Sequence, residues 1–220
     1  HGGGKRNIVH KSAGDGRDPQ NNGDQLIISI GREFGSGGHE IGEKLAELYH
    51  LPFYDHNLLD EIAKARDLDG NELAAFDESV RNKLLSRTVC GFNNSPSYNV
   101  AHLQFDYLKK KAVSGESFII VGRCAEHVLR STKGLISIFV LGDREEKLAR
   151  VMRIYHLPED KAEKLMKEKD KKRKDYHNSY SDGKWGDSRN YDLSVNSSKL
   201  SIEENVRLLQ EYINARRAHV

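Results

Sequence analysis

The sequence predicts an α/β fold in which a parallel sheet of about five strands carries helices on both faces. Short apolar, β-branched runs alternate along the chain with longer segments whose apolar residues recur at helical spacing. The run GLISIFVLG, residues 134–142, is almost continuously apolar, as expected of a strand that is covered on both sides. Strand–helix–strand connections of this kind place successive strands in parallel. We therefore expect one domain over residues 26–220.

Composition narrows the classes of protein to consider. The chain has 220 residues, a net charge of only +2 and no apolar stretch long enough to span a membrane, so neither nucleic acid nor a membrane is an expected partner. Residues 1–25 are polar and rich in Gly, Asn and Asp, which predicts a flexible leader. Cys90 and Cys124 form no metal-type pair, and we interpret them as reduced thiols of a cytoplasmic protein.

In the first half of the chain, β-branched runs bounded by turn residues predict strands, and Ile41, Leu45 and Leu48 set the helical period of the first helix. A loop is expected where Gly, Asn, Ser and Pro gather. The expected elements are strand 25–30, helix 37–49, strand 51–56, a helix beginning at Leu58, a helix around 73–84, loop 90–99 and a helix from Val100 to Val113.

In the second half, Asp143 and Pro158 mark helix starts, and Ser201 with Glu204 forms the pattern of a capping box. The helix that begins at Pro158 is strongly basic and lies between the fourth and fifth strands, so we expect a lid over about 158–190. The expected elements are strand 117–122, helix 123–130, strand 134–142, helix 143–156, the lid helix 158–180, loop 181–190, strand 191–198 and helix 201–217.

A glycine-rich turn joins the first strand to the first helix. Gly35, Gly37 and Gly38 would let the backbone curl around an anion. The backbone amides of residues 35–40, which include Ser36, His39 and Glu40, would point at that anion from the helix N-terminus. The pattern G-x-x-x-x-G-K-[ST] is not met, because Gly38 stands where the lysine would be. A tight turn without a ligand is the alternative interpretation.

The stretch SIGREFGSGGHEIGEKLAELYHLPFYD, residues 29–55, resembles the start of the cytidylate kinase-like family, a branch of the P-loop nucleoside monophosphate kinases. Four further stretches resemble that family in the same order: FIIVGRCAEHVL, LISIFVLGDREEKLARVM, KDKKRKDY and WGDSRNYDLSVNSSKLSIEENVRLL. The sequence departs from true cytidylate kinases at Gly38, at Cys124, where an acid that reads the base would stand, and at Met166, where an arginine would stand.

The resemblance implies a P-loop kinase that uses ATP and Mg²⁺ and transfers the γ-phosphoryl group to a small nucleotide such as CMP. It also implies that Asp55 lies near the acceptor phosphate and that Arg123 borders the monophosphate pocket. Asp170, which forms the D-x-x-R pattern of the lid with Arg173, is implied to take part in substrate binding. Arg153, on the helix before the lid, is a further candidate for phosphate contact.

Phosphoryl transfer needs positive charge around the transferred group, and the missing lysine must be replaced. Arg32 is the candidate replacement, at the start of the loop and two residues past the expected strand; pairing with Glu33 is its structural alternative. Closure of the lid would add Arg173 with Lys169 or Lys172, although a charge run is often only a solvated helix face.

Several of these residues have a purely structural interpretation as well as a functional one. His39 is either a neutral donor or an exposed first-turn residue, and Asp55 orients the acceptor or caps a helix. Glu40 is a weak candidate for a Mg²⁺ ligand and otherwise favours the helix dipole. Arg123 contacts substrate or forms a buried salt bridge.

The sequence leaves three functions open for this chain. The first is a nucleotide kinase, for CMP or another small acceptor. The second is a non-catalytic nucleotide or phosphate sensor, which the missing lysine favours. The third, an RNA- or polyphosphate-binding module, is disfavoured because the basic residues are confined to one helix. The sequence does not indicate the oligomeric state.

Overall fold

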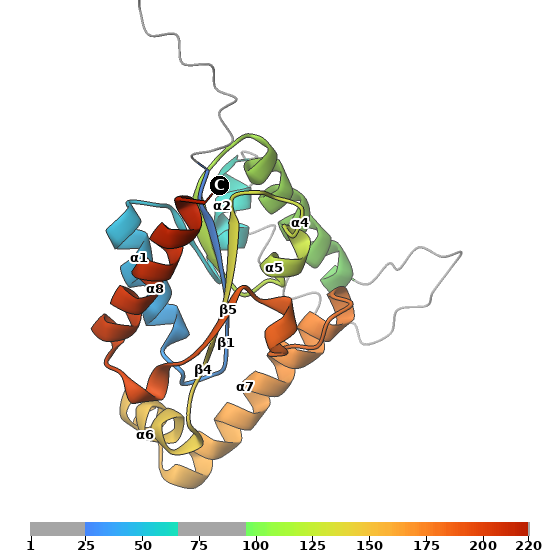
Figure 1. Ribbon diagram of the computed structural model, residues 1–220. Coiled ribbons are helices and arrows are strands. Elements are labelled where there is room, and N and C mark those ends of the chain that lie inside the picture. The colour runs from blue at the N-terminus through green and yellow to red at the C-terminus, as the bar shows by residue number, and fades with distance from the viewer. Residues whose placement is uncertain (1–24, 66–95, 220) are drawn as a thin grey trace, which may run out of the picture.

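Five parallel strands form one sheet in the order β2-β3-β1-β4-β5, in a computed structural model that describes residues 25–65 and 96–219 (Figure 1). The predicted parallel α/β sheet is therefore confirmed. β1 lies in the middle and pairs with β3 on one side and β4 on the other. The strand bounds are β1 Ile27–Arg32, β2 Phe53–Tyr54, β3 Phe118–Val121, β4 Leu135–Leu141 and β5 Leu193–Asn196.

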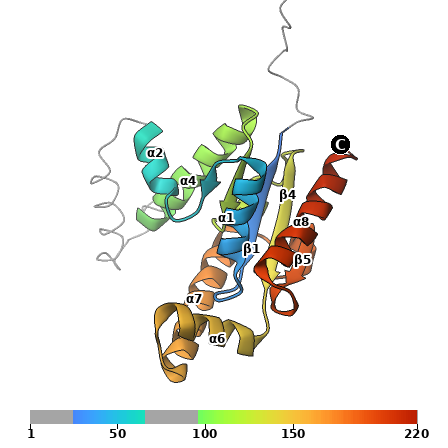
Figure 2. The ribbon, with the colours of Figure 1, turned by 90° about the vertical axis from the view of Figure 1, so that its left-hand side faces the viewer.

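Helices cover both faces of the sheet. α1 and α8 pack on one face, which is turned toward the viewer in Figure 2, and α2, α4 and α5 build the core on the other face. None of the helices in the described ranges is long and apolar enough to cross a membrane. The helix bounds are α1 Gly38–Tyr49, α2 Leu58–Ala65, α4 Pro96–Val113, α5 Ala125–Val128, α6 Arg144–Tyr155, α7 Glu159–Tyr180 and α8 Ile202–Arg217; Ser188–Asn190 and Ser197–Lys199 are short 3-10 turns.

The two faces of the central strand supply two separate cores, because side chains alternate along a strand. Ile28 and Ile30 point toward α1 and α8 and pack with Leu45 and Leu209. Ile27 points the other way, into a cluster built by α2, α4 and α5. These buried faces fix β1 in register, and with it the loop that follows β1.

The lid helix α7 is held to the glycine loop by a third, smaller cluster. Phe34 of the loop packs with Leu148 and Val151 of α6 and with Ala162 and Met166 of α7. Met166, where the resemblance led us to expect an arginine, is therefore a buried packing residue. In Figure 1, α6 and the start of α7 lie beyond the carboxyl end of β4, and α7 then runs back toward the level of the strands.

The structure corrects several expected boundaries. β1 runs to Arg32, not to residue 30, because its pairing with β4 continues through Arg32 and Val140. The expected loop 90–99 is helical from Pro96, since proline is favoured in the first turn of a helix. The helix expected over 123–130 is only Ala125–Val128, because Arg123 and Cys124 adopt left-handed backbone angles. The helix expected around 73–84, Cys90 and residues 1–24 of the expected leader lie outside the described residues.

A substitution of Leu45 tests how much the core beneath α1 contributes to the stability of the fold. Its side chain has no exposed surface, whereas Leu48 on the same helix is 41% exposed. Leu45→Ala is expected to lower the free energy of unfolding by about 2–5 kcal/mol. The matched change Leu48→Ala should cost less than about 0.5 kcal/mol. Chemical denaturation followed by circular dichroism measures both, and equal losses would contradict the assignment of Leu45 to the core.

Candidate functional site

The glycine loop leaves a row of backbone amides free at the N-terminus of α1. Gly35 and Gly37 have φ angles of +85° and +82°, which a side chain rarely allows. Within the described residues, the amides of Gly35, Gly37, His39 and Glu40 have no protein acceptor. Four free donors at a helix N-terminus fit the oxygens of a phosphate chain.

The loop is fixed from behind by hydrogen bonds that leave those amides open. The Ser197 hydroxyl donates to the Ser36 carbonyl at 2.6 Å, and the Ser36 hydroxyl donates to the Glu33 carbonyl at 2.9 Å. The Glu33 carboxylate accepts from Lys147 Nζ at 2.8 Å and from the Gly142 amide at 3.1 Å. Glu33 therefore supports the loop, and its partner is Lys147 rather than Arg32.

Arg32 fills the space that a side chain at position 38 would need. A Cβ added to Gly38 would lie 2.6 Å from Arg32 Cβ, and a Cβ on Gly122 would collide with the Arg32 guanidinium. The guanidinium thus crosses from the loop to the end of β3. Among the described residues Arg32 forms no ion pair, and its Nε is buried without a hydrogen-bond partner.

A buried and unpaired guanidinium is electrostatically costly. Burial lowers the pKa of Arg32 to about 9, with further lowering by the charges of Arg173 and Arg123 and a partly compensating rise from Asp55. The pKa of Arg173 is also lowered by burial, although Asp170 opposes that shift. Arg32, Arg123 and Arg173 place three positive charges beside the two carboxylates of Asp55 and Asp170. The excess positive charge would attract an anion.

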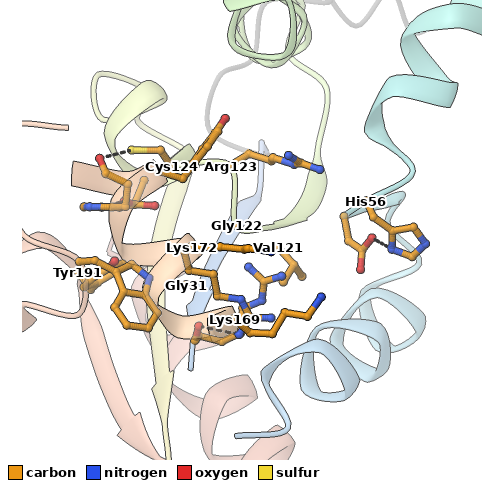
Figure 3. A pocket seen from close by; sticks show the side chains of 16 residues that line it. Gly31, His56, Val121, Gly122, Arg123, Cys124, Lys169, Lys172 and Tyr191 are labelled. Atoms are coloured by element: carbon orange, nitrogen blue, oxygen red, sulfur yellow. Dashed lines mark hydrogen bonds and ion pairs between the residues drawn. The ribbon is translucent and has the colours of Figure 1, made fainter. Parts of the chain in front are cut away.

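Two cavities open on either side of Arg32. The first, of about 510 Å³, lies over the loop and is lined by its glycines together with His39, Glu40 and Arg150. The second, of about 480 Å³, lies at the ends of β1 and β3, and Figure 3 views it with Arg123, Cys124, Lys169 and Tyr191 on its walls. We call them the loop cavity and the strand-end cavity. Arg32, Asp55 and Arg173 line both.

Asp55 lies at the end of β2 and is buried between two histidines. Its carboxylate contacts His39 Nδ1 at 2.7 Å and also His56. His39 is 45% exposed and its other ring nitrogen contacts Glu43 at 3.2 Å. The predicted loop residue His39 therefore orients the predicted acid Asp55, an arrangement that suits a proton acceptor or an anchor for a substrate hydroxyl.

The strand-end cavity combines positive charge with flat aromatic walls. Arg123, Lys169 and Lys172 line it together with Arg32 and Arg173. Tyr176 and Trp185 add aromatic surface, and Trp185 packs edge-on against Phe139 at 5.5 Å between ring centroids. Such a cavity suits an anionic small molecule with a flat ring.

Asp170 differs from its expected role in substrate binding. Its carboxylate accepts a 2.6 Å hydrogen bond from the Phe34 amide and lies 3.6 Å from Arg173, and it lines neither cavity. Burial raises the pKa of Asp170, while the Phe34 amide opposes that shift. Asp170 thus clamps the lid to the loop, because α7 packs against Phe34.

Sequence reasoning missed Arg150. Its guanidinium lies over Gly37 and pairs with Glu40 at 2.6 Å, so Glu40, the candidate Mg²⁺ ligand, is already engaged. Arg153 is exposed and lines a separate cavity of about 400 Å³ with Ser36 and Ser198. The spacing of three residues between Lys147 and Arg150 places them on one helix face and could have revealed both.

The charge of Arg32 is expected to reduce stability in the absence of an anion. Its folded pKa of about 9 lies below its ordinary value, so the penalty is fully present below pH 9 and falls as pH rises above 9. At pH 7.5, Arg32→Met should be neutral or stabilise the chain by up to about 1–4 kcal/mol, and should remove the stabilisation by added phosphate. Thermal unfolding with and without phosphate measures both, with exposed Arg207→Met as control. A clear loss of stability in Arg32→Met would contradict this prediction.

The contact between positions 32 and 38 predicts a coupled pair of substitutions. Gly38→Ala alone should lower the free energy of unfolding by about 1–3 kcal/mol through overpacking. In an Arg32→Gly background the same change should be neutral or stabilising, because the space is free and alanine favours a helix. A double-mutant cycle measures the coupling. Additive effects would show that the two side chains do not compete for one space.

Comparisons with known proteins agree with the observed fold. A solved structure described as an uncharacterized protein from Eubacterium ventriosum shares 40% sequence identity, with a TM-score of 0.68, over 86% of this chain and 99% of its own. A shikimate kinase from Bacteroides thetaiotaomicron shares 15% identity and a TM-score of 0.50, over 86% of this chain and 98% of its own, which shows a common fold. The search of curated proteins found no match.

The match to a protein family covers the glycine loop, both cavities and the lid. It runs over residues 27–199, from the first residue of β1 to the turn after β5. This range is well over half of the chain. The resemblance inferred from the sequence is confirmed: the chain belongs to the cytidylate kinase-like family.

Proposed function

We propose that this protein transfers the γ-phosphoryl group of ATP to a small anionic acceptor, and that the acceptor is a nucleoside monophosphate similar to CMP. The observation that carries the proposal is the meeting of two cavities at three residues. Arg32, Asp55 and Arg173 line both the loop cavity and the strand-end cavity. A group passing from one cavity to the other would be surrounded by two guanidinium groups and one carboxylate.

The loop cavity suits the donor. The free amides from Gly35 to Glu40 would hold the phosphate chain, and Arg32 would supply the charge that a loop lysine supplies in related sequences. Arg150 lies over Gly37 and adds a second cation. Arg173 closes the site from the lid, where Asp170 holds α7 on the loop.

Carboxylates for Mg²⁺ are present at the same place. Asp55 and Glu40 line the loop cavity and offer the oxygen ligands that Mg²⁺ prefers, although Glu40 would have to leave Arg150. When bound, Mg²⁺ would neutralise charge on the triphosphate. The Arg173 guanidinium lies over the Phe34 ring, 5.3 Å from its centroid, and would help to orient the donor from the α7 side of the loop.

The strand-end cavity suits the acceptor. Arg123, Lys169 and Lys172 favour a phosphate, and the rings of Tyr176 and Trp185 favour a flat base. A kinase of a small hydroxyl compound is the second candidate, favoured by the 2.7 Å contact between His39 and Asp55, which could accept a hydroxyl proton. A monophosphate acceptor needs no such proton transfer.

The assay is transfer of phosphoryl from ATP, with Mg²⁺, to CMP, dCMP, UMP and AMP, and in a second series to small polyols and hydroxy acids. Arg173→Met is expected to lower kcat/KM by on the order of 100- to 1000-fold, the scale of one lost transition-state donor. Lys174→Met, on the exposed side of α7 and absent from both cavities, is the matched control and should change kcat/KM by less than about threefold.

Each outcome of the assay has a distinct meaning. Turnover with a monophosphate, lost in Arg173→Met and retained in Lys174→Met, supports the proposal. Turnover only with hydroxyl compounds, lost in Asp55→Asn, supports the second candidate. ATP binding by calorimetry without turnover on any acceptor would overturn both and support a nucleotide sensor.

A further inference from the structure

A cluster of three metal-ligating side chains lies on the wall of the strand-end cavity. Cys124, Glu126 and His177 each direct one ligand atom into the cluster, and these atoms all lie within 4.8 Å of one another. All three residues are buried and line the cavity. They come from different elements: the turn after β3, helix α5 and the lid helix α7.

The backbone before the cluster adopts an unusual conformation. Gly122, Arg123 and Cys124 follow one another with φ angles of +80°, +60° and +54°. Two consecutive residues other than glycine in this region are uncommon, and such strain gathers at functional sites. It cuts α5 short and turns the Cys124 side chain into the cluster, where Sγ lies 3.9 Å from the His177 carbonyl oxygen.

The histidine is oriented for coordination. Asn178 Oδ1 accepts from the Trp185 amide at 2.9 Å and lies 3.4 Å from His177 Nδ1. Oδ1 can accept a proton from Nδ1, while Nε2 faces Glu126 Oε1, 2.6 Å away. At that distance a cation lies between Nε2 and the carboxylate: a proton in the metal-free chain, whose place a metal ion can take.

We propose that Cys124, Glu126 and His177 bind one Zn²⁺ ion, with the fourth coordination position open to the strand-end cavity. A thiolate, an imidazole and a carboxylate form a ligand set suited to Zn²⁺, whereas Mg²⁺ and Ca²⁺ prefer oxygen ligands alone. Three protein ligands with one open position are the pattern of zinc sites that contact a substrate. Binding would displace the thiol proton, and Nε2 and Oε1 would move apart to admit the ion.

The surroundings of the cluster fit such a ligand. The hydroxyls of Tyr176 and Tyr191 are buried and form no well-aligned hydrogen bond within the described residues. Both side chains line the same cavity, and Tyr191 is only 8% exposed. A water or acceptor atom on the open position would give these hydroxyls a partner. The ion would also tie α7 to α5. This inference does not depend on phosphoryl transfer.

The test uses the full chain after removal of metal with a chelator, under anaerobic conditions. Titration with Co²⁺ should produce a thiolate-to-cobalt charge-transfer band and the visible spectrum of a tetrahedral site, saturating near one Co²⁺ per chain. Addition of Zn²⁺ should abolish both signals and protect Cys124 from alkylation. Cys124→Ser should remove the thiolate band, and Glu126→Gln or His177→Gln should weaken Zn²⁺ binding by more than about 100-fold.

The controls are matched in type and place. Cys90→Ser removes the other cysteine of the chain, and His127→Gln changes the neighbour of Glu126 that is absent from the cluster. Both variants should retain the cobalt spectrum. Circular dichroism confirms that each variant is folded. A thiolate band absent from the parent chain, or unchanged in Cys124→Ser, would overturn the zinc site and leave Glu126 and His177 as a buried ion pair.

Discussion

The Arg32 side chain connects the end of β1 with the end of β3 at the carboxyl edge of the sheet. It begins on the last residue of β1, passes through the space left by the absence of a side chain at Gly38, and reaches the end of β3 at Gly122. Burial and two other arginines depress its pKa, and the described residues provide no ion pair in return. Gly38 and Gly122 leave room for this guanidinium, and Arg123 and Arg173 add positive charges that a bound anion would neutralise.

In the proposed function, Arg32 supplies the charge that a lysine at the position of Gly38 supplies in ordinary phosphate-binding loops. Arg32 is the last residue of β1, six residues before Gly38, so the proposed cation would be anchored on a strand rather than on a helix. The lid supports the same end of the site, since Asp170 and Phe34 join α7 to the loop and bring Arg173 near Arg32.

The strand-end cavity contains more than the basic residues that would bind a phosphate. It contains the basic residues expected around an acceptor, and it contains Cys124, Glu126 and His177, which a phosphate does not require. The strained turn of β3 turns Cys124 toward them. The proposed acceptor site and the proposed metal site therefore share one short segment, in which Arg123 and Cys124 adopt positive φ angles that are uncommon for residues other than glycine.

The sequence by itself determined the parallel α/β sheet, the glycine-rich turn after the first strand, the long basic helix α7 and the family, because these depend on local periodicity, turn chemistry and the order of motifs. It also selected Arg32, Asp55, Arg123, Lys169 and Arg173, which the structure brings to two adjoining cavities. Only the tertiary structure decided that Asp170 clamps the lid, that Glu40 pairs with Arg150, and that His177 meets Glu126 and Cys124. Those contacts join residues 51 to 136 positions apart, and their geometry depends on how helices pack on the sheet, which no local pattern encodes.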